Sequence, residues 1–196
     1  MASLIFLIFL VAVALWGISA YNTLVALKGQ TVNAWKQIDV QLKRRHDLIP
    51  NLVNAVKGAM EFERDTLEAV IQARNQAVKI QADALPTGGV QALAQAEAAL
   101  SSALSRLNVV VERYPDLKAT SNVAQLQEEL TSTENRVAFA RQLYNDTATS
   151  YNIKQQQVPW NLVAGLARAE TVELWEIEDA GDRDVPQVDL SVNPKA

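Results

Sequence analysis

The sequence predicts an all-α protein with an N-terminal transmembrane helix, an antiparallel four-helix bundle, a short C-terminal helix and an acidic tail. Three observations lead to this prediction. Residues 2–21 carry no charged side chain. Apolar residues then recur at helical spacing through most of the chain. Glycine and proline are few and cysteine is absent, which excludes disulfides and thiolate metal sites. We therefore expect an anchor over residues 1–21, a bundle over 22–169 and a tail over 170–196.

The N-terminal segment is almost continuous hydrocarbon from residue 4 to 16. Residues 2–21 are long enough to cross a bilayer core of roughly 30 Å as a helix, and we expect them to contact lipid. The alternative is a cleaved signal peptide, but a positive n-region is missing and Ile18 stands where a small residue is needed. No Lys or Arg precedes the span, whereas Lys28 follows it. The positive-inside rule then predicts a single-pass protein of the cell membrane with its N-terminus outside and its bundle in the cytoplasm.

Two amphipathic helices are predicted between residues 35 and 84. The apolar side chains on their faces are Trp35, Ile38, Leu42, Ile49, Leu52, Val56, Ala59, Leu67, Val70 and Ala77. We expect the helices to form a hairpin because proline removes a backbone donor and clashes with the preceding turn. The hairpin motif comprises Arg44, Arg45, His46, Asp47 and Pro50. Asp47 would be the N-cap and Pro50 would lie in the first turn, with the basic side chains in solvent.

The remaining helices follow from the same periodicity. A loop over residues 86–89 precedes a helix predicted to run from Val90 to Tyr114. A further helix is predicted from about Ser121 to Lys154, and a short one over 161–168. No helix buries its apolar stripe alone, and short connections force neighbouring helices to run in opposite directions, so an antiparallel bundle is expected.

The tail is strongly acidic. Its acidic residues are Glu170, Glu173, Glu176, Glu178, Asp179, Asp182 and Asp184. We interpret it most simply as a partly disordered, solubilising segment. The alternative is a docking peptide for a basic partner surface, anchored by Trp175. The formal net charge of −4 offers no basic field for nucleic acid, so no nucleic-acid partner is predicted.

The sequence predicts no catalytic or cofactor-binding motif. The chain contains one histidine, His46, with no glutamate three residues before it, as a bundle-core di-iron site would need. Gly88 and Gly89 lack the lysine and the strand of a phosphate-binding loop. We expect no enzyme activity, no cofactor and no metal, and a hydrogen-bonded loop position for His46.

Polar residues at buried helical positions form the candidate site. Glu97 lies between Leu93 and Leu100 on an apolar stripe, so its carboxylate needs a partner, for which Arg74 or Arg141 is expected. The full candidate cluster is Arg74, Glu97, Arg136, Arg141, Tyr144 and Asn145. One interpretation is a buried polar layer that fixes helix register. The other is a polar pocket or a partner-binding face.

The run from Trp35 to Val53, WKQIDVQLKRRHDLIPNLV, resembles the signature of the LemA family. Further matching residues are Val56-Lys57-Gly58, Ala73-Arg74, Tyr114-Pro115-Asp116-Leu117, Glu134-Asn135-Arg136, Ala140-Arg141, Tyr144-Asn145 and Tyr151-Asn152. The resemblance covers roughly residues 21 to 165. It implies a membrane-anchored helical bundle and supplies no established biochemical activity.

We therefore predict a non-enzymatic scaffold or adaptor at the cell membrane, with a membrane-protein partner. The alternative is a small-ligand sensor or an unrecognised enzyme that uses the Arg/Tyr/Asn/Glu cluster. A pocket converging on Glu97, Arg136 and Arg141 would favour the sensor, and a paired Glu97 in a packed core would favour the scaffold. A third interpretation, a self-assembling homo-oligomer, would be favoured by an exposed apolar stripe.

Overall fold

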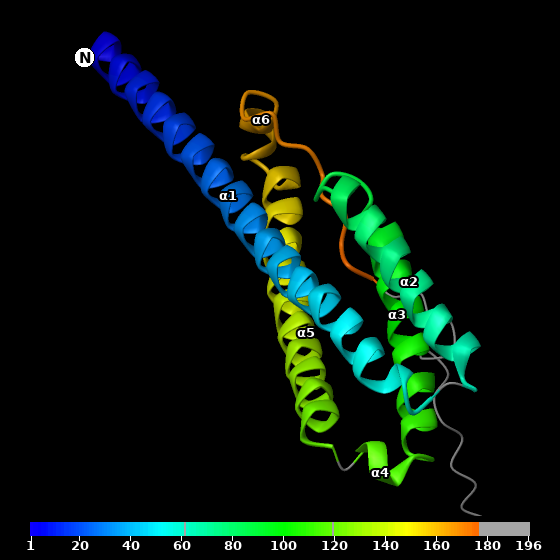
Figure 1. Cartoon of the computed structure of the whole chain (residues 1–196). Helices are drawn as coiled ribbons and strands as arrows, with labels where there is room; N and C mark the ends of the chain where they lie inside the picture. Colours follow the sequence, from blue (N-terminus) through cyan, green and yellow to red (C-terminus); the bar gives the residue numbers. More distant parts are fainter. Residues whose placement is uncertain (61, 119, 177–196) are drawn as a thin grey trace, which may run out of the picture.

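The computed structural model describes residues 1–60, 62–118 and 120–176, and this part of the chain is all-helical apart from an isolated bridge between Leu85 and Gly88 (Figure 1). Its elements are α1 (Ala2–Lys57), α2 (Arg64–Asp83), α3 (Val90–Val111), α4 (Pro115–Lys118), α5 (Ser121–Gln156) and α6 (Asn161–Ala164).

Helix α1 has an apolar N-terminal part that stands clear of the other helices (Figure 1). Its most apolar 18-residue window has a mean hydropathy of 2.5, and none of that window is buried. By length and composition, α1 is the one helix in the described part of the chain able to cross a membrane. Ala20 is the first buried residue, and the helix continues from there without interruption to Lys57.

The predicted hairpin at Asp47–Pro50 is wrong. Helix α1 continues through this motif with Pro50 inside it, so Asp47 is not an N-cap. The chain instead turns after Lys57 and resumes as α2 at Arg64. The basic side chains are not all in solvent either, because Arg45 is buried although Arg44 is exposed.

The long helices pack in two pairs. The C-terminal half of α1 lies along α5, and the two run in opposite directions (Figure 1). Helices α2 and α3 form the second pair, and α2 also packs on α1. In the loop that connects α2 to α3, Leu85 and Gly88 form two backbone hydrogen bonds with each other. Gly89 then enters α3 with a φ of +92°, a left-handed conformation that glycine adopts without strain.

The buried apolar side chains form two clusters. One contains Ile49, Leu52, Val56, Val70, Leu100, Leu107 and Val123. The other contains Trp35, Ile38, Leu42, Leu93, Val137, Tyr144, Tyr151, Val172 and Trp175. Arg45 and His46 separate the two clusters along α1, and Glu97 lies beside their boundary along α3. A polar layer therefore crosses the middle of the core.

Beyond α5 the chain forms a short cap and then an extended segment. Helix α6 ends at Ala164, earlier than the predicted residue 168, and packs on both α1 and α5. The chain returns along α5 toward α3 up to residue 176 (Figure 1). Residues 171–176 are called the docked segment below. The acidic residues Glu178, Asp179, Asp182 and Asp184 lie outside the described residues.

Candidate functional site

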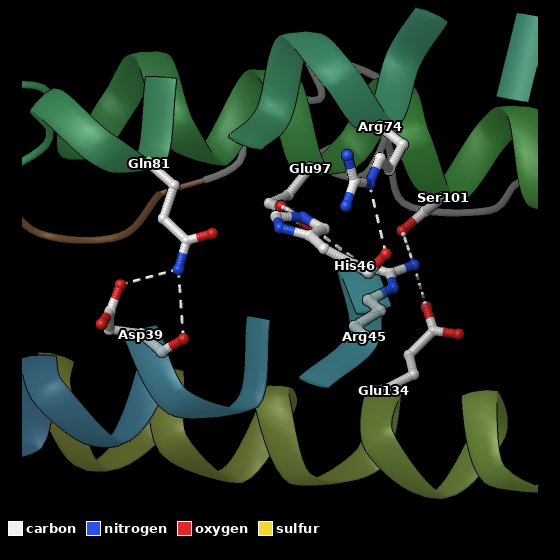
Figure 2. Close-up of polar contacts among 8 residues, drawn as sticks. All are labelled: Asp39, Arg45, His46, Arg74, Gln81, Glu97, Ser101 and Glu134. Carbon is white, nitrogen blue, oxygen red and sulfur yellow. Dashed lines mark hydrogen bonds and ion pairs between the residues drawn. The ribbon is translucent and has the colours of Figure 1, made fainter. Parts of the chain in front are cut away.

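The polar layer is built around the carboxylate of Glu97 (Figure 2). Arg45 Nη1 donates to Glu97 Oε2 at 3.1 Å, and His46 Nε2 donates to Glu97 Oε1 at 2.7 Å. The side chains of these three residues are between 2% and 4% exposed. Each carboxylate oxygen thus has its own donor, as a buried anion requires.

The guanidinium of Arg45 extends the polar layer toward α5. Its Nη2 donates to Ser101 Oγ at 2.8 Å and lies 3.8 Å from Glu134 Oε1 (Figure 2). Glu134 is itself about half exposed, so this second carboxylate gives the buried cation a partner that remains in contact with water. Arg45 thereby joins side chains from α1, α3 and α5.

The predicted identity of the partner of Glu97 is wrong. The sequence predicts Arg74 or Arg141, whereas Arg45 and His46 bind the carboxylate. The error follows from the predicted hairpin, which placed both side chains at a solvated tip. His46 is accordingly a buried residue within α1 and not a loop histidine.

Arg74 supports the layer through the backbone of α1. Within an α-helix, the carbonyl of residue 46 would accept from the N–H of residue 50, but Pro50 has no N–H. Arg74 Nε donates to this carbonyl at 3.2 Å and so replaces the missing helical bond (Figure 2). Farther along the same pair of helices, Gln81 Nε2 donates to the backbone and side-chain oxygens of Asp39 at 3.1 and 2.6 Å. Side chains of α2 therefore support α1 at two places.

The docked segment is held to α5 by two asparagines that each bind the backbone of one residue. Asn152 accepts from the N–H of Val172 at 3.0 Å and donates to its carbonyl at 2.8 Å. Asn145 likewise accepts from the N–H of Trp175 at 2.8 Å and donates to its carbonyl at 3.0 Å. Seven helical residues rise about 10.5 Å, and three extended residues span about 10 Å, so the two spacings match.

Side chains of the docked segment complete the core. Trp175 is 4% exposed, with its ring centroid 6.4 Å from that of Trp35. Arg141 lies over the Trp175 ring at 5.7 Å, a cation–π contact. Burial lowers the pKa of Arg141, and the charge of Arg45 acts in the same direction. In this conformation Trp175 is buried in the core of its own chain.

The docked segment also bonds to α3 and to Tyr144. Gly89 offers no side chain to cap α3, and Glu173 Oε2 accepts from the N–H of Val90 at 2.9 Å instead. Tyr144 donates its hydroxyl to the Glu173 carbonyl at 2.6 Å. Burial raises the pKa of Tyr144, and the charge of Glu173 adds to the rise, so the hydroxyl stays protonated and available as a donor.

The six predicted cluster residues occupy three places. Glu97 and Arg74 belong to the polar layer. Arg141, Tyr144 and Asn145 contact the docked segment. Arg136 is exposed and lines a groove of about 490 Å³ between α1 and α5. The other residues of this α1–α5 groove are Lys36, Gln37, Val40, Gln41, Phe139, Ala140 and Leu143.

Sequence reasoning missed the role of Glu173 and the binding of the docked segment's backbone by Asn145 and Asn152. Two signals were available. The seven-residue spacing of the asparagines puts them on one face of a helix. The glycine before Val90 leaves the first N–H groups of α3 in need of an acceptor.

No group of three or more His, Cys, Asp or Glu side chains is arranged to hold a metal ion in the part of the chain that the structure describes. The paired groups of the polar layer are engaged with one another. Their bonds join α1 to α3 and α5. The docked segment is held separately, by Asn145, Asn152 and Tyr144.

Fold and site together define an all-helical protein with one long apolar N-terminal helix and a polar layer in its core. The family model described as LemA family matches residues 34–190, and the chain belongs to this family. It is 28% identical over 169 residues to Protein LemA of Metamycoplasma hominis, covering 86% of this chain and 74% of the relative.

Magnetosome proteins are also similar to this chain. Magnetosome protein MamQ 1 of Paramagnetospirillum magneticum is 27% identical over 184 residues, covering 83% of this chain. Magnetosome protein MamQ of Magnetospirillum gryphiswaldense is 24% identical over 189 residues, covering 86% of this chain and 70% of the relative. The chain spans 66% of the length of the Paramagnetospirillum magneticum protein.

Replacing Arg74 with methionine tests its role as a substitute donor. The variant leaves the His46 carbonyl without its donor and should lower the free energy of unfolding by about 1–3 kcal/mol. In a Pro50→Ala background, residue 50 regains its N–H, so Arg74→Met should cost measurably less. Urea denaturation of the full chain in detergent micelles measures both costs. Lys79→Met, at an exposed position of α2, is the charge-matched control. An equal cost of Arg74→Met in both backgrounds would contradict the role.

Replacing Asn152 with alanine tests the backbone pairing of the docked segment. The loss of its two hydrogen bonds to Val172, and of the one that Gln155 Nε2 donates to Asn152 Oδ1 at 3.1 Å, should lower the free energy of unfolding by about 1–3 kcal/mol. It should also accelerate hydrogen exchange at the amides of Val172 and Trp175, which mass spectrometry of the full chain detects. Asn135→Ala, at an exposed position of α5, should change neither. Unchanged exchange in Asn152→Ala would refute the pairing.

Proposed function

We propose that this protein is a non-enzymatic scaffold or adaptor that α1 anchors in the cell membrane. Residues 1–21 would cross the bilayer, and an antiparallel four-helix bundle over 22–169 would lie in the cytoplasm. Anchoring confines the bundle to the membrane plane, which raises its effective concentration against membrane partners without any new contact.

The pairing of Glu97 is the observation that carries this proposal. A ligand sensor would need free polar groups converging on a pocket. Arg45 and His46 engage the carboxylate of Glu97, whereas Arg136 lies in the surface groove and Arg141 on Trp175. The interpretation as a sensor or enzyme therefore has less support than the scaffold.

The α1–α5 groove is the surface we assign to a partner. Phe139 is 73% exposed and Val40 60% exposed, so large apolar side chains face solvent beside the cations Lys36 and Arg136. Exposed aromatic and aliphatic side chains flanked by arginine are typical of protein interfaces. An apolar partner segment with acidic flanks would fit this groove. A second copy of the chain is the competing occupant.

A photoreactive residue at position 139 in the full chain tests the proposal in intact membranes. We expect one reproducible protein adduct from position 139 and none from Gln76, an exposed position of α2. An adduct of twice the mass of the chain would favour the homo-oligomer over the adaptor. A failure to crosslink any protein, combined with thermal stabilisation of the purified chain by a small metabolite, would overturn the scaffold.

A further inference from the structure

The α6 cap, residues 158–168, exposes apolar side chains. Val158 is 76% exposed, Leu162 73% and Leu166 78%. No charged residue occurs between Lys154 and Arg168 in the sequence. An apolar surface of this kind marks contact with a protein or a membrane.

The α6 cap lies against α1 where the apolar part of that helix ends. Lys28 Nζ donates to the carbonyl of Arg168 at 3.2 Å, and α6 packs on α1. Ala20 and Leu24 are the first buried residues of α1, each 1% exposed. Apart from α1 itself, α6 is the element closest to the free N-terminal part of that helix (Figure 1).

The rise of α1 per residue gives the depth at which the α6 cap contacts α1 relative to a bilayer. A helix that enters the hydrocarbon at Ala2 and rises 1.5 Å per residue has crossed roughly 30 Å near Tyr21. Lys28 then lies about 10 Å farther along α1. The part of α1 that the α6 cap touches therefore coincides with the headgroup layer.

We propose that the α6 cap is a second membrane contact, inserted into the interfacial layer of the bilayer that α1 crosses. Val158, Leu162 and Leu166 would enter the boundary between headgroups and acyl chains. Trp160 supplies an aromatic ring of the type enriched at this depth. Lys154 Nζ, 3.4 Å from the Trp160 ring centroid, and Arg168 are placed to meet lipid phosphates. The inference depends on the membrane span and is independent of the α1–α5 groove.

Two contacts would restrain the bundle more than one. A single helix allows rotation about the membrane normal and variable tilt. Contact through α6, which is packed on both α1 and α5, fixes one side of the bundle toward the lipid. The α1–α5 groove would then have a defined direction relative to the membrane surface.

The test uses the absence of cysteine from the chain. Single-cysteine variants at Leu162 and Leu166 of the full chain are labelled with an environment-sensitive fluorophore and placed in nanodiscs of zwitterionic and anionic phospholipid. Lipids with a spin label near the glycerol then quench any fluorophore at interfacial depth. Tyr21 is the positive reference, and Val109, 64% exposed on α3, is the matched negative control.

We expect quenching at positions 162 and 166 comparable with that at 21, and none at 109. Emission typical of water, unquenched at both cap positions, would overturn the inference. Emission typical of an apolar environment that lipid spin labels do not quench would also overturn it, because protein would then cover the cap. Val158 provides a second labelling site on the same cap, and circular dichroism verifies that each variant is folded.

Discussion

The burial of one carboxylate constrains the rest of the structure. Removing an ionised group from water costs several kcal/mol, which only close and well-oriented donors recover. Glu97 meets this requirement through two consecutive residues of α1, so α1 and α3 must keep one register. Arg45 must in turn reach Ser101 and Glu134, which extends the same restraint to α5. Apolar packing alone would tolerate sliding of these helices, whereas the ion network does not.

A second constraint acts on α1. Pro50 lacks a backbone N–H, so the helix needs another donor for the His46 carbonyl if it is to continue past this residue. A proline inside a helix normally leaves a carbonyl unsatisfied and favours a break. Here Arg74 supplies the donor from α2, so the helix continues from the apolar N-terminal part to Lys57. Continuity matters for the proposed function because a single rigid helix transmits the position of the anchor directly to the polar layer. A hairpin at residue 47 would have placed a turn between the anchor and the following helix.

The sequence predicts much of the fold, but the contacts within the site are less predictable. The apolar span, the loop at 86–89, the starts of α3 and α5 and the burial of Glu97 all follow from local pattern. The hairpin was wrong because the effect of Pro50 depends on an arginine of another helix. The position of Trp175 depends on two asparagines whose partners are backbone atoms some twenty to thirty residues away. Backbone recognition leaves no pattern in the recognised segment, so the spacing of the asparagines indicates a binding face on α5 but does not identify the residues that it binds.

A double-mutant cycle of Arg45→Met and Glu97→Gln tests the central claim, that this ion pair governs helix register. Each single substitution leaves one charge of the buried Arg45–Glu97 pair without the opposite charge of the other and should cost about 3–5 kcal/mol in free energy of unfolding. The double variant removes both charges, so its cost should fall below the sum of the singles by at least about 1 kcal/mol. Denaturation in detergent micelles measures the free energy of unfolding of the unmodified full chain, the two single variants and the double variant. Costs that add to within about 0.5 kcal/mol would show that the two residues act independently and would contradict the account.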